Sequence, residues 1–312
     1  MSETSQGGPR RFVPDAVLVA VTAVWGSSFV VVKNVLGVAP PFEFLFFRFL
    51  LGTAIVALLA RSRRATPDVL RDGLLVGLLL AAGMALQVLG QTETTASKAA
   101  FLTGLSVVLT PFAAYARTRR LPSLENGIGI SLASAGFFVL TFPRTGEPFE
   151  RGDLLLTGCG IVFAFYIVEL AERSPRHDPV LFTGVQLATV ALVALGLMLA
   201  LRLPLLAGFH AAAVEARPVA WGGTFLGSVL YLGSIGAVGT FLGQTWAQRQ
   251  MPATHAAIIF TLEPVFAALF AAWLLSEHLE ARGFAGGALV LAGIVVSEVR
   301  LRRKGSILSS LR

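Results

Sequence analysis

A carboxylate and a proline stand side by side within one apolar run near the end of the chain. The run extends from about residue 253 to residue 275, long enough to cross a bilayer, and contains Glu263 and Pro264. A carboxylate at bilayer depth costs roughly 2.5–3.5 kcal/mol on insertion scales, so it requires a partner, a proton or a function. The proline leaves the carbonyl of Phe260 without its helical hydrogen-bond donor. We therefore expect a kinked helix whose polar groups face the interior of a bundle.

The pattern around this run occurs twice, at a constant offset. The tetrapeptide L-G-Q-T stands at residues 242–245 and at residues 89–92, an offset of 153 residues, and the same offset relates Pro264 to Pro111. We expect both prolines to kink their helices at equivalent depths. Position 263 falls on Thr110, which cannot ionise in the relevant range, so the carboxylate is not repeated.

A second offset relates the earlier parts of the two halves. Asp153 falls on Asp15 and Gln186 on Arg48 at an offset of 138 residues. The difference from the first offset corresponds to one longer loop in the second half, around residues 202–221. Two constant offsets, each joining several matches in order, indicate an internal duplication.

Composition indicates a polytopic membrane protein. The chain has 312 residues, of which 55% are hydrophobic and 14% charged, whereas a soluble protein carries about 25% charged residues. Its formal charge of +7 lies mostly in short segments between apolar runs, which favours membrane topology over nucleic-acid binding. The single cysteine and four scattered histidines show no ligand spacing, and no cofactor motif is present, so we expect no metal and no cofactor.

The apolar runs predict ten transmembrane helices. They are expected at about 15–36, 42–60, 73–91, 95–115, 124–142, 153–172, 180–201, 222–246, 253–275 and 281–300. Most of the 25 Lys and Arg residues then fall on the side of the two termini, which favours cytoplasmic termini. Five helices in each half make the second half enter the membrane upside down, as in many secondary transporters. The predicted boundaries are tails at 1–14 and 301–312, repeats at 15–142 and 153–300, and an extracytoplasmic linker at 143–152.

Three motifs carry a resemblance to a known family. The segments W-G-S-S-F-V-V-V-K at 25–33, F-F-R-F-L at 46–50 and T-L-E-P-V-F at 261–266 resemble signatures of the EamA family, in the drug/metabolite transporter superfamily. The resemblance covers roughly residues 15–300. It implies a ten-helix transporter of small organic solutes, often an exporter, and does not identify the solute.

Glu263 and Arg48 are the first candidates for solute binding or coupling. Glu263 could bind a proton, which would make the proton the coupling ion, or a cationic group of the solute; the alternative is a structural hydrogen bond. Arg48 could hold a carboxylate with its planar guanidinium. Its alternatives are snorkelling to the outer surface and a fixed ion pair with Glu43 or with Glu263.

Four further residues complete the candidate site. Gln91 and Gln244 occupy equivalent helix ends and could line the pathway, although helix-end solvation is the more frequent explanation for such residues. Trp25 lies near the middle of its span and could form a wall of the cavity, or else anchor the helix at the membrane interface. Thr110 is the counterpart of Glu263. Together these features predict a secondary transporter in the cytoplasmic membrane that exports amino-acid-like or other amphipathic solutes and is not an enzyme. The alternatives are an exporter of drugs or organic cations, and a membrane-embedded receptor or enzyme.

Overall fold

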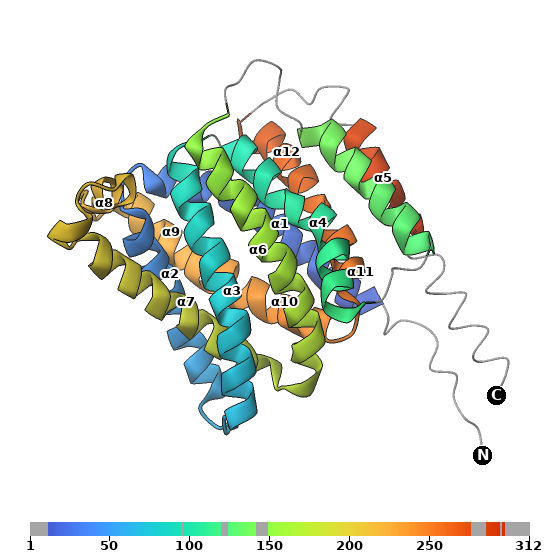
Figure 1. Cartoon of the computed structure of the whole chain (residues 1–312), viewed down its shortest axis with the longest axis horizontal. Coiled ribbons are helices and arrows are strands. Elements are labelled where there is room, and N and C mark those ends of the chain that lie inside the picture. The colour runs from blue at the N-terminus through green and yellow to red at the C-terminus, as the bar shows by residue number, and fades with distance from the viewer. Residues whose placement is uncertain are drawn as a thin grey trace.

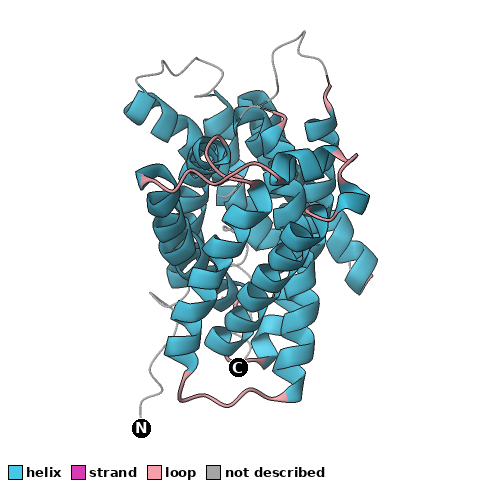
Figure 2. Cartoon of the chain, turned by 90° about the vertical axis from the view of Figure 1, so that its left-hand side faces the viewer, coloured by secondary structure: helices cyan, strands magenta, loops and turns pink. Residues whose placement is uncertain are grey.

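The computed structural model is a bundle of helices, and the residues it describes contain no strand (Figure 2). It describes residues 12–94, 96–119, 124–141, 149–275, 285–293 and 295–296. The helices are α1 (Phe12–Leu36), α2 (Pro41–Ala60), α3 (Pro67–Thr92), α4 (Ala96–Thr118), α5 (Leu124–Thr141), α6 (Arg151–Arg173), α7 (Pro179–Leu201), α8 (His210–Glu215), α9 (Gly223–Gly233), α10 (Thr240–Gln248), α11 (Ala253–Phe260) and α12 (Leu262–Leu275). Residues 1–11 of the predicted N-terminal tail, the predicted C-terminal tail and most of the linker at 143–152 lie outside these residues, whereas residues 12–14 already belong to α1.

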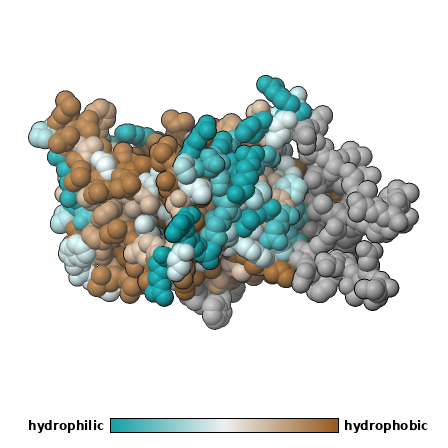
Figure 3. Space-filling model, turned by 90° about the horizontal axis from the view of Figure 1, so that it is seen from below, coloured by the Kyte–Doolittle hydropathy of each residue, from teal (hydrophilic) through white to brown (hydrophobic). Residues whose placement is uncertain are grey.

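Seven helical segments in the described part of the chain are long and apolar enough to cross a membrane. They are α1, α2, α3, α4 from Lys98, α6 through Arg176, α7, and the stretch Gly223–Gln248. Large apolar side chains such as Leu58, Leu192 and Leu230 are exposed on them, as expected of surfaces that face lipid. From below, hydrophobic surface flanks a hydrophilic area (Figure 3). The chain is therefore a membrane-embedded, multi-pass protein.

The ninth of the ten predicted spans, where a kink at Pro264 was expected, consists of two helices. The segment predicted at 253–275 is divided into α11 and α12, with a turn at Thr261. Pro264 explains the division, because it stands in the first turn of α12 and has no backbone N–H to donate to the carbonyl of Phe260. Pro111 differs, since α4 continues through it. The tenth predicted span is described at residues 285–293, which are helical and lie against α5 (Figure 1).

The two halves of the chain are interleaved (Figure 1). Helices α3 and α4 of the first half pack against helices of the second half: α3 contacts α6 and α7, and α4 contacts α6. The exchanged contacts are present too: the region of α9 and α10 packs against α1 and α2, and α11 and α12 pack against α1. Helices α2 and α7, which correspond to each other in the repeat, pack together. These contacts between the halves thus have counterparts, as expected when two similar units surround a common centre.

A π-helical turn joins α9 to α10 and was not predicted. It covers Ser234–Gly239, in the middle of the eighth predicted span. The backbone oxygen of Gly236 accepts hydrogen bonds from Thr240 Oγ1 at 2.8 Å and from Arg48 Nη2 at 3.2 Å. A π-turn changes the hydrogen-bond register of the helix, and such turns occur frequently at functional sites.

Residues 202–221, the longer loop of the second half, cover one end of the bundle. We call this end, where α2 begins and α7 ends, the vestibule end. The loop contains α8, which packs against α2 and α7 (Figure 1). The buried carboxylate of Glu215 accepts hydrogen bonds from the backbone N–H groups of Phe42 at 2.9 Å and Glu43 at 3.0 Å. These donors belong to the first turn of α2 and have no partner within the helix. Glu215 therefore caps α2 from a distant part of the chain.

We expect Glu215 to make stability depend on pH. Burial raises its pKa from 4.5 to about 7, although the two backbone donors and Arg202 favour the charged form. The folded protein therefore holds this proton more tightly than the unfolded chain, so the contribution to stability is complete below pH 4.5 and is lost as the pH rises through 7. The melting temperature of the wild type should therefore fall between pH 4.5 and pH 8 by more than that of Glu215→Gln, whose side chain cannot ionise. Parallel melting curves in detergent across this range would contradict the prediction.

Candidate functional site

A small cavity lies at the centre of the bundle, and both halves of the chain contribute to it. About 60 Å³ is open to water-sized molecules. This is room for a few waters, since one needs about 10–15 Å³ by the same measure. The lining residues come from α1, α2, α3, α4, α6, α10, α11 and α12: Trp25, Ser28, Phe29, Arg48, Met84, Gln87, Thr103, Ser106, Val107, Phe163, Tyr166, Ile167, Phe241, Gln244, Phe260 and Glu263.

Glu263 enters the cavity from the first turn of α12. Gly26 of α1 permits its position, because a Cβ at residue 26 would lie 2.9 Å from the backbone oxygen of Glu263. Within the described part of the chain, the Glu263 carboxylate makes no hydrogen bond and no ion pair. A carboxylate in this position requires a proton or a cation, since burying it unpaired is costly.

Arg48 enters the same cavity from α2 and is buried, with 3% of its surface exposed. Its Nη2 donates to the backbone oxygen of Gly236, and its guanidinium lies 5.1 Å from the centre of the Phe49 ring. Among the described residues its Nε has no hydrogen-bond partner. The snorkelling alternative is therefore wrong. Pairing with Glu43 is also wrong, because Glu43 is bridged to Arg202. Within the described residues Arg48 and Glu263 form no ion pair, so the guanidinium can still take up an anionic group.

Trp25 forms an aromatic wall of the cavity. Its ring lies 5.3 Å from the ring of Phe260 and 6.0 Å from that of Phe241, centre to centre, and both phenylalanines also line the cavity. Phe163 and Phe29 add further ring surface. Such a wall suits the apolar body of a solute, because it offers a large contact area with little loss of side-chain freedom.

Gln244 belongs to a buried set of hydrogen bonds that the sequence analysis missed. The Tyr166 hydroxyl lies 3.2 Å from Gln244 Oε1 and 3.3 Å from Gln186 Oε1. Gln244 Nε2 donates to Gln248 Oε1 at 2.8 Å, and Gln248 Nε2 donates to the backbone oxygen of Ile167 at 3.0 Å. A tyrosine in the middle of an otherwise apolar span was the available signal. The set joins α6, α7 and α10 directly beside the cavity.

Gln91 and Thr110 lie outside the cavity lining. Gln91 is buried, its Oε1 has no hydrogen-bond partner, and its backbone oxygen accepts from Lys33 Nζ at 2.8 Å. Helix-end solvation is therefore wrong for Gln91, and equally for the buried Gln244. Thr110 is buried and donates to the backbone oxygen of Ser106 one turn earlier at 2.7 Å. Gln87, one turn before Gln91, is the glutamine of α3 that reaches the cavity.

The cavity thus combines a carboxylate, a guanidinium, neutral polar groups and an aromatic wall. In the described residues, no group of three His, Cys, Asp or Glu side chains is placed to hold a metal ion. An ammonium group would suit Glu263, and a carboxylate would suit the planar fork of Arg48. The arrangement is suited to binding a small solute with separated charges and an apolar body.

Comparison with known proteins identifies the family. The model of the EamA-like transporter family matches the chain twice, at residues 14–142 and 150–298. The chain belongs to the EamA-like transporter family. The two matches are two repeats of the same family unit, so the duplication inferred from the sequence offsets is confirmed. Membership makes the protein a membrane transporter, as the motifs at 25–33 and 261–266 predicted.

Relatives of this EamA-like protein carry names that agree with the family. Two proteins of Archaeoglobus fulgidus (strain ATCC 49558), each named "Uncharacterized transporter", are 26% identical to it over 295 residues. The alignments cover 94% and 91% of this chain, and 88% and 97% of the relatives. A solved structure titled "Crystal structure of protein" has a TM-score of 0.73 at 19% identity and covers 94% of this chain and 99% of its own, which supports the fold alone.

Proposed function

We propose that this EamA-like protein is a secondary transporter that exports small amphipathic metabolites of amino-acid type across the cytoplasmic membrane. The observation that carries the proposal is the central cavity, in which Glu263 and Arg48 face the same space without an ion pair between them. An α-amino acid offers both groups a counter-ion at once, and its side chain can lie against Trp25. The solute contacts the cavity, and the outer helix faces contact lipid.

Alternating access is the mechanism that we infer for this transport. The exchanged helix contacts support two inverted repeats of five helices, ten spans in total. The excess of Lys and Arg on the side of the termini supports a cytoplasmic location for both of them. The vestibule end would then be extracytoplasmic. The cavity is far smaller than the 300–1,000 Å³ typical of small-molecule sites. A solute therefore enters only when the repeats separate at one end.

An ion pair and an aspartate–histidine contact are placed to control that separation. Asp153, at the start of α6, lies 2.7 Å from Lys98 Nζ, near the start of α4. Asp15, at the start of α1, lies 3.0 Å from His255 Nε2, near the start of α11. The two aspartates correspond in the repeat, and so do their partner helices. The pairs therefore form equivalent bridges between the halves, one at each end of the bundle.

Further ion pairs join the halves at the end opposite the vestibule. Asp72 of α3 contacts Arg173 of α6, and its other oxygen lies 2.9 Å from His177 Nε2. Glu169 of α6 is bridged to Arg117 of α4 at 2.6 Å. Bridges at both ends around a small central cavity support a conformation in which the cavity is closed to both sides. Transport requires each set to break in turn.

Flux measurements in proteoliposomes test the proposed function. A panel of zwitterionic, cationic and neutral solutes of similar size should show exchange of zwitterions with an apolar side chain. Cells that overproduce the protein should also resist toxic analogues of the same solutes. Absence of flux and of resistance across the panel would contradict the transport proposal.

An exporter of organic cations is the second candidate. The carboxylate of Glu263, which has no partner among the described residues, favours it, because a cation alone would satisfy that group. In this case Arg48 would serve mainly to hold the π-helical turn through Gly236. Cation flux that survives Arg48→Gln, together with no zwitterion flux, would decide for this candidate. The proton would act as coupling ion in either candidate if it occupies Glu263 between transport steps.

A further inference from the structure

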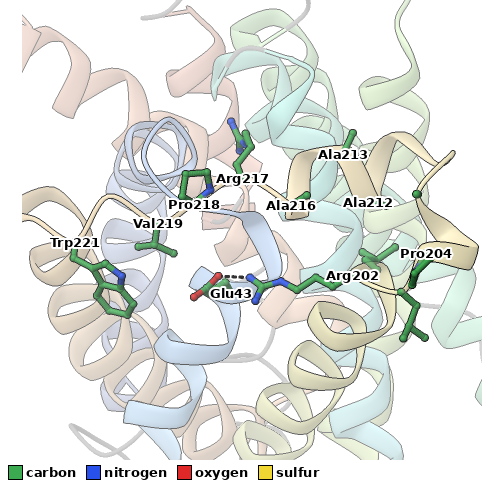
Figure 4. A pocket seen from close by; sticks show the side chains of 13 residues that line it. Glu43, Arg202, Pro204, Ala212, Ala213, Ala216, Arg217, Pro218, Val219 and Trp221 are labelled. Atoms are coloured by element: carbon green, nitrogen blue, oxygen red, sulfur yellow. Dashed lines mark hydrogen bonds and ion pairs between the residues drawn. The ribbon is translucent and has the colours of Figure 1, made fainter.

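A larger pocket opens at the vestibule end, away from the central cavity (Figure 4). Its volume is about 540 Å³, within the range of small-molecule sites. The walls are the start of α2, the end of α7, α8, and the segment that leads to α9. Most of it is built by residues 202–221, the loop that has no counterpart in the first half. The pocket therefore depends on the loop of the second repeat, and α2 of the first repeat supplies one wall.

Opposite charges meet in the middle of this vestibule pocket. Figure 4 shows the carboxylate of Glu43 and the guanidinium of Arg202 joined across its centre. One guanidinium nitrogen of Arg202 contacts one carboxylate oxygen, which leaves donors on the arginine and an acceptor on Glu43 unused. Arg217, on the rim, is held by hydrogen bonds to the backbone oxygens of Val214 and Leu36, both at 3.1 Å. Charged groups of both signs are thus available to a ligand.

An indole ring lies at one side of the same pocket. The centre of the Trp221 ring lies 5.6 Å from that of Phe47 on α2 and 5.0 Å from that of Phe225 on α9, both edge to face. Trp221 is nevertheless 62% exposed. A ring that is fixed on one side and open on the other is suited to hold an apolar group at low entropic cost.

The same three groups therefore occur in the vestibule and in the central cavity. Glu43, Arg202 and Trp221 supply a carboxylate, a guanidinium and an indole here, as Glu263, Arg48 and Trp25 do at the centre. We propose that the vestibule pocket is a second binding site for zwitterionic solutes with an aromatic or branched aliphatic side chain. The class of solute rests on the proposed function, whereas the presence of the pocket and its charged groups does not depend on that function.

Helix α2 connects the two sites. Glu43 lies in its first turn and Arg48 five residues further along, a rise of about 7.5 Å. Phe47 touches Trp221 on the vestibule side and directly precedes Arg48 in sequence. A solute released from Arg48 toward this end would therefore meet Arg202 and Glu43 within about one and a half turns of the same helix. The vestibule site is placed to receive the solute before it leaves the protein.

The fluorescence of Trp221 tests the vestibule site directly. The chain has four tryptophans, and replacing Trp25, Trp246 and Trp273 by phenylalanine leaves Trp221 as the reporter. Replacing Trp25 alters the central cavity and can impair transport. The Trp221 signal reports binding in the vestibule pocket whether or not this variant transports solutes. L-Phenylalanine and L-leucine should change the emission saturably. Phenylacetate and phenethylamine, which each lack one charge, should bind about fivefold more weakly or worse.

Arginine variants provide the matched control. Arg202→Gln in the single-tryptophan protein should weaken L-phenylalanine binding about fivefold or more. Arg64→Gln, which removes an exposed arginine at the other end of the bundle, should leave binding unchanged. If L-phenylalanine gives the same response in both variants, the proposal is overturned. The response would then come from non-specific partitioning of the amino acid and not from binding at Arg202.

The remaining outcomes separate this inference from the proposed function. No saturable change with either amino acid in the millimolar range would overturn the vestibule site. Flux of these amino acids in wild-type proteoliposomes without a Trp221 response would overturn the vestibule site alone. A Trp221 response sensitive to Arg202→Gln, with no flux of any solute, would support the vestibule site and contradict the proposed function.

Discussion

Glu263→Gln should retain folding and lose coupled transport by at least about tenfold. The carboxylate has no partner in the described part of the chain, so the change breaks no contact and its effect on melting temperature should be small. A loss of about 1.4 kcal/mol in solute or proton binding already corresponds to tenfold, and charge-assisted contacts often contribute more. Accumulation driven by a pH gradient and counterflow of a neutral solute should be measured in the same proteoliposomes.

The pattern of loss assigns the role of Glu263. Loss of gradient-driven accumulation with retained counterflow indicates that the carboxylate carries the coupling proton. Loss of solute binding itself indicates contact with a cationic group. Lower expression and melting temperature, partly rescued by Arg48→Leu, would instead indicate a structural pair. Unaltered binding, coupling and stability would remove Glu263 from the mechanism.

Glu172→Gln is the matched control for this experiment. Glu172 is an exposed glutamate near the end of α6 and does not line the central cavity. Its replacement removes the same charge and should leave transport within about twofold of wild type, because an exposed charge contributes little. Equal losses in both variants would point to a general effect of net charge.

Several features of the fold followed from local rules in the sequence. Long apolar runs predicted the position of each described span, since few alternatives satisfy the backbone in lipid. Pro264 predicted the interruption of the ninth span because proline removes a donor wherever it stands. The same rule applies to Pro111, yet α4 continues through it. The difference depends on packing around each helix, which no local pattern records.

The site was less accessible to sequence reasoning than the fold. Glu263, Arg48, Trp25 and Gln244 were singled out because polar or large aromatic groups within spans require an explanation, and all four line the central cavity. Gln91 was chosen by the same argument and lies one turn beyond the cavity, where Gln87 takes its place. Which glutamine of one helix reaches the centre depends on helix rotation, and the apolar pattern here is too uniform to fix it.

Contacts between distant segments could not be predicted at all. Glu215 caps α2 from more than 170 positions away in sequence. The sequence predicted only that the loop containing Glu215 is longer than its counterpart in the first half. The π-helical turn at Ser234–Gly239 likewise has no signature in a span rich in glycine. Both features depend on partners from other helices, Phe42 and Arg48 respectively. Such partners appear only when the two halves are assembled.

Asp153→Asn and Asp15→Asn should shift the transporter in opposite directions. Asp153→Asn breaks the bridge to Lys98 at the vestibule end and so removes a buried ion pair that stabilises the closed form. The vestibule end should therefore open. Asp15→Asn breaks the bridge to His255, so the opposite end should open instead, by a smaller amount because Asp15 is more exposed than Asp153.

Labelling of a single cysteine in the cavity measures both shifts. Cys159 is the only cysteine and is buried, so Cys159→Ala followed by Ser28→Cys gives a reporter in the cavity lining. Membrane-impermeant thiol reagents applied to oriented vesicles should react faster from the vestibule side in Asp153→Asn and from the other side in Asp15→Asn. The double variant should lie between the Asp153→Asn variant and the wild type, because the two bridges oppose each other in one equilibrium and the Asp15 bridge is the weaker. Both variants labelling faster from the same side would exclude equivalent bridges, and with them the inverted arrangement of the repeats.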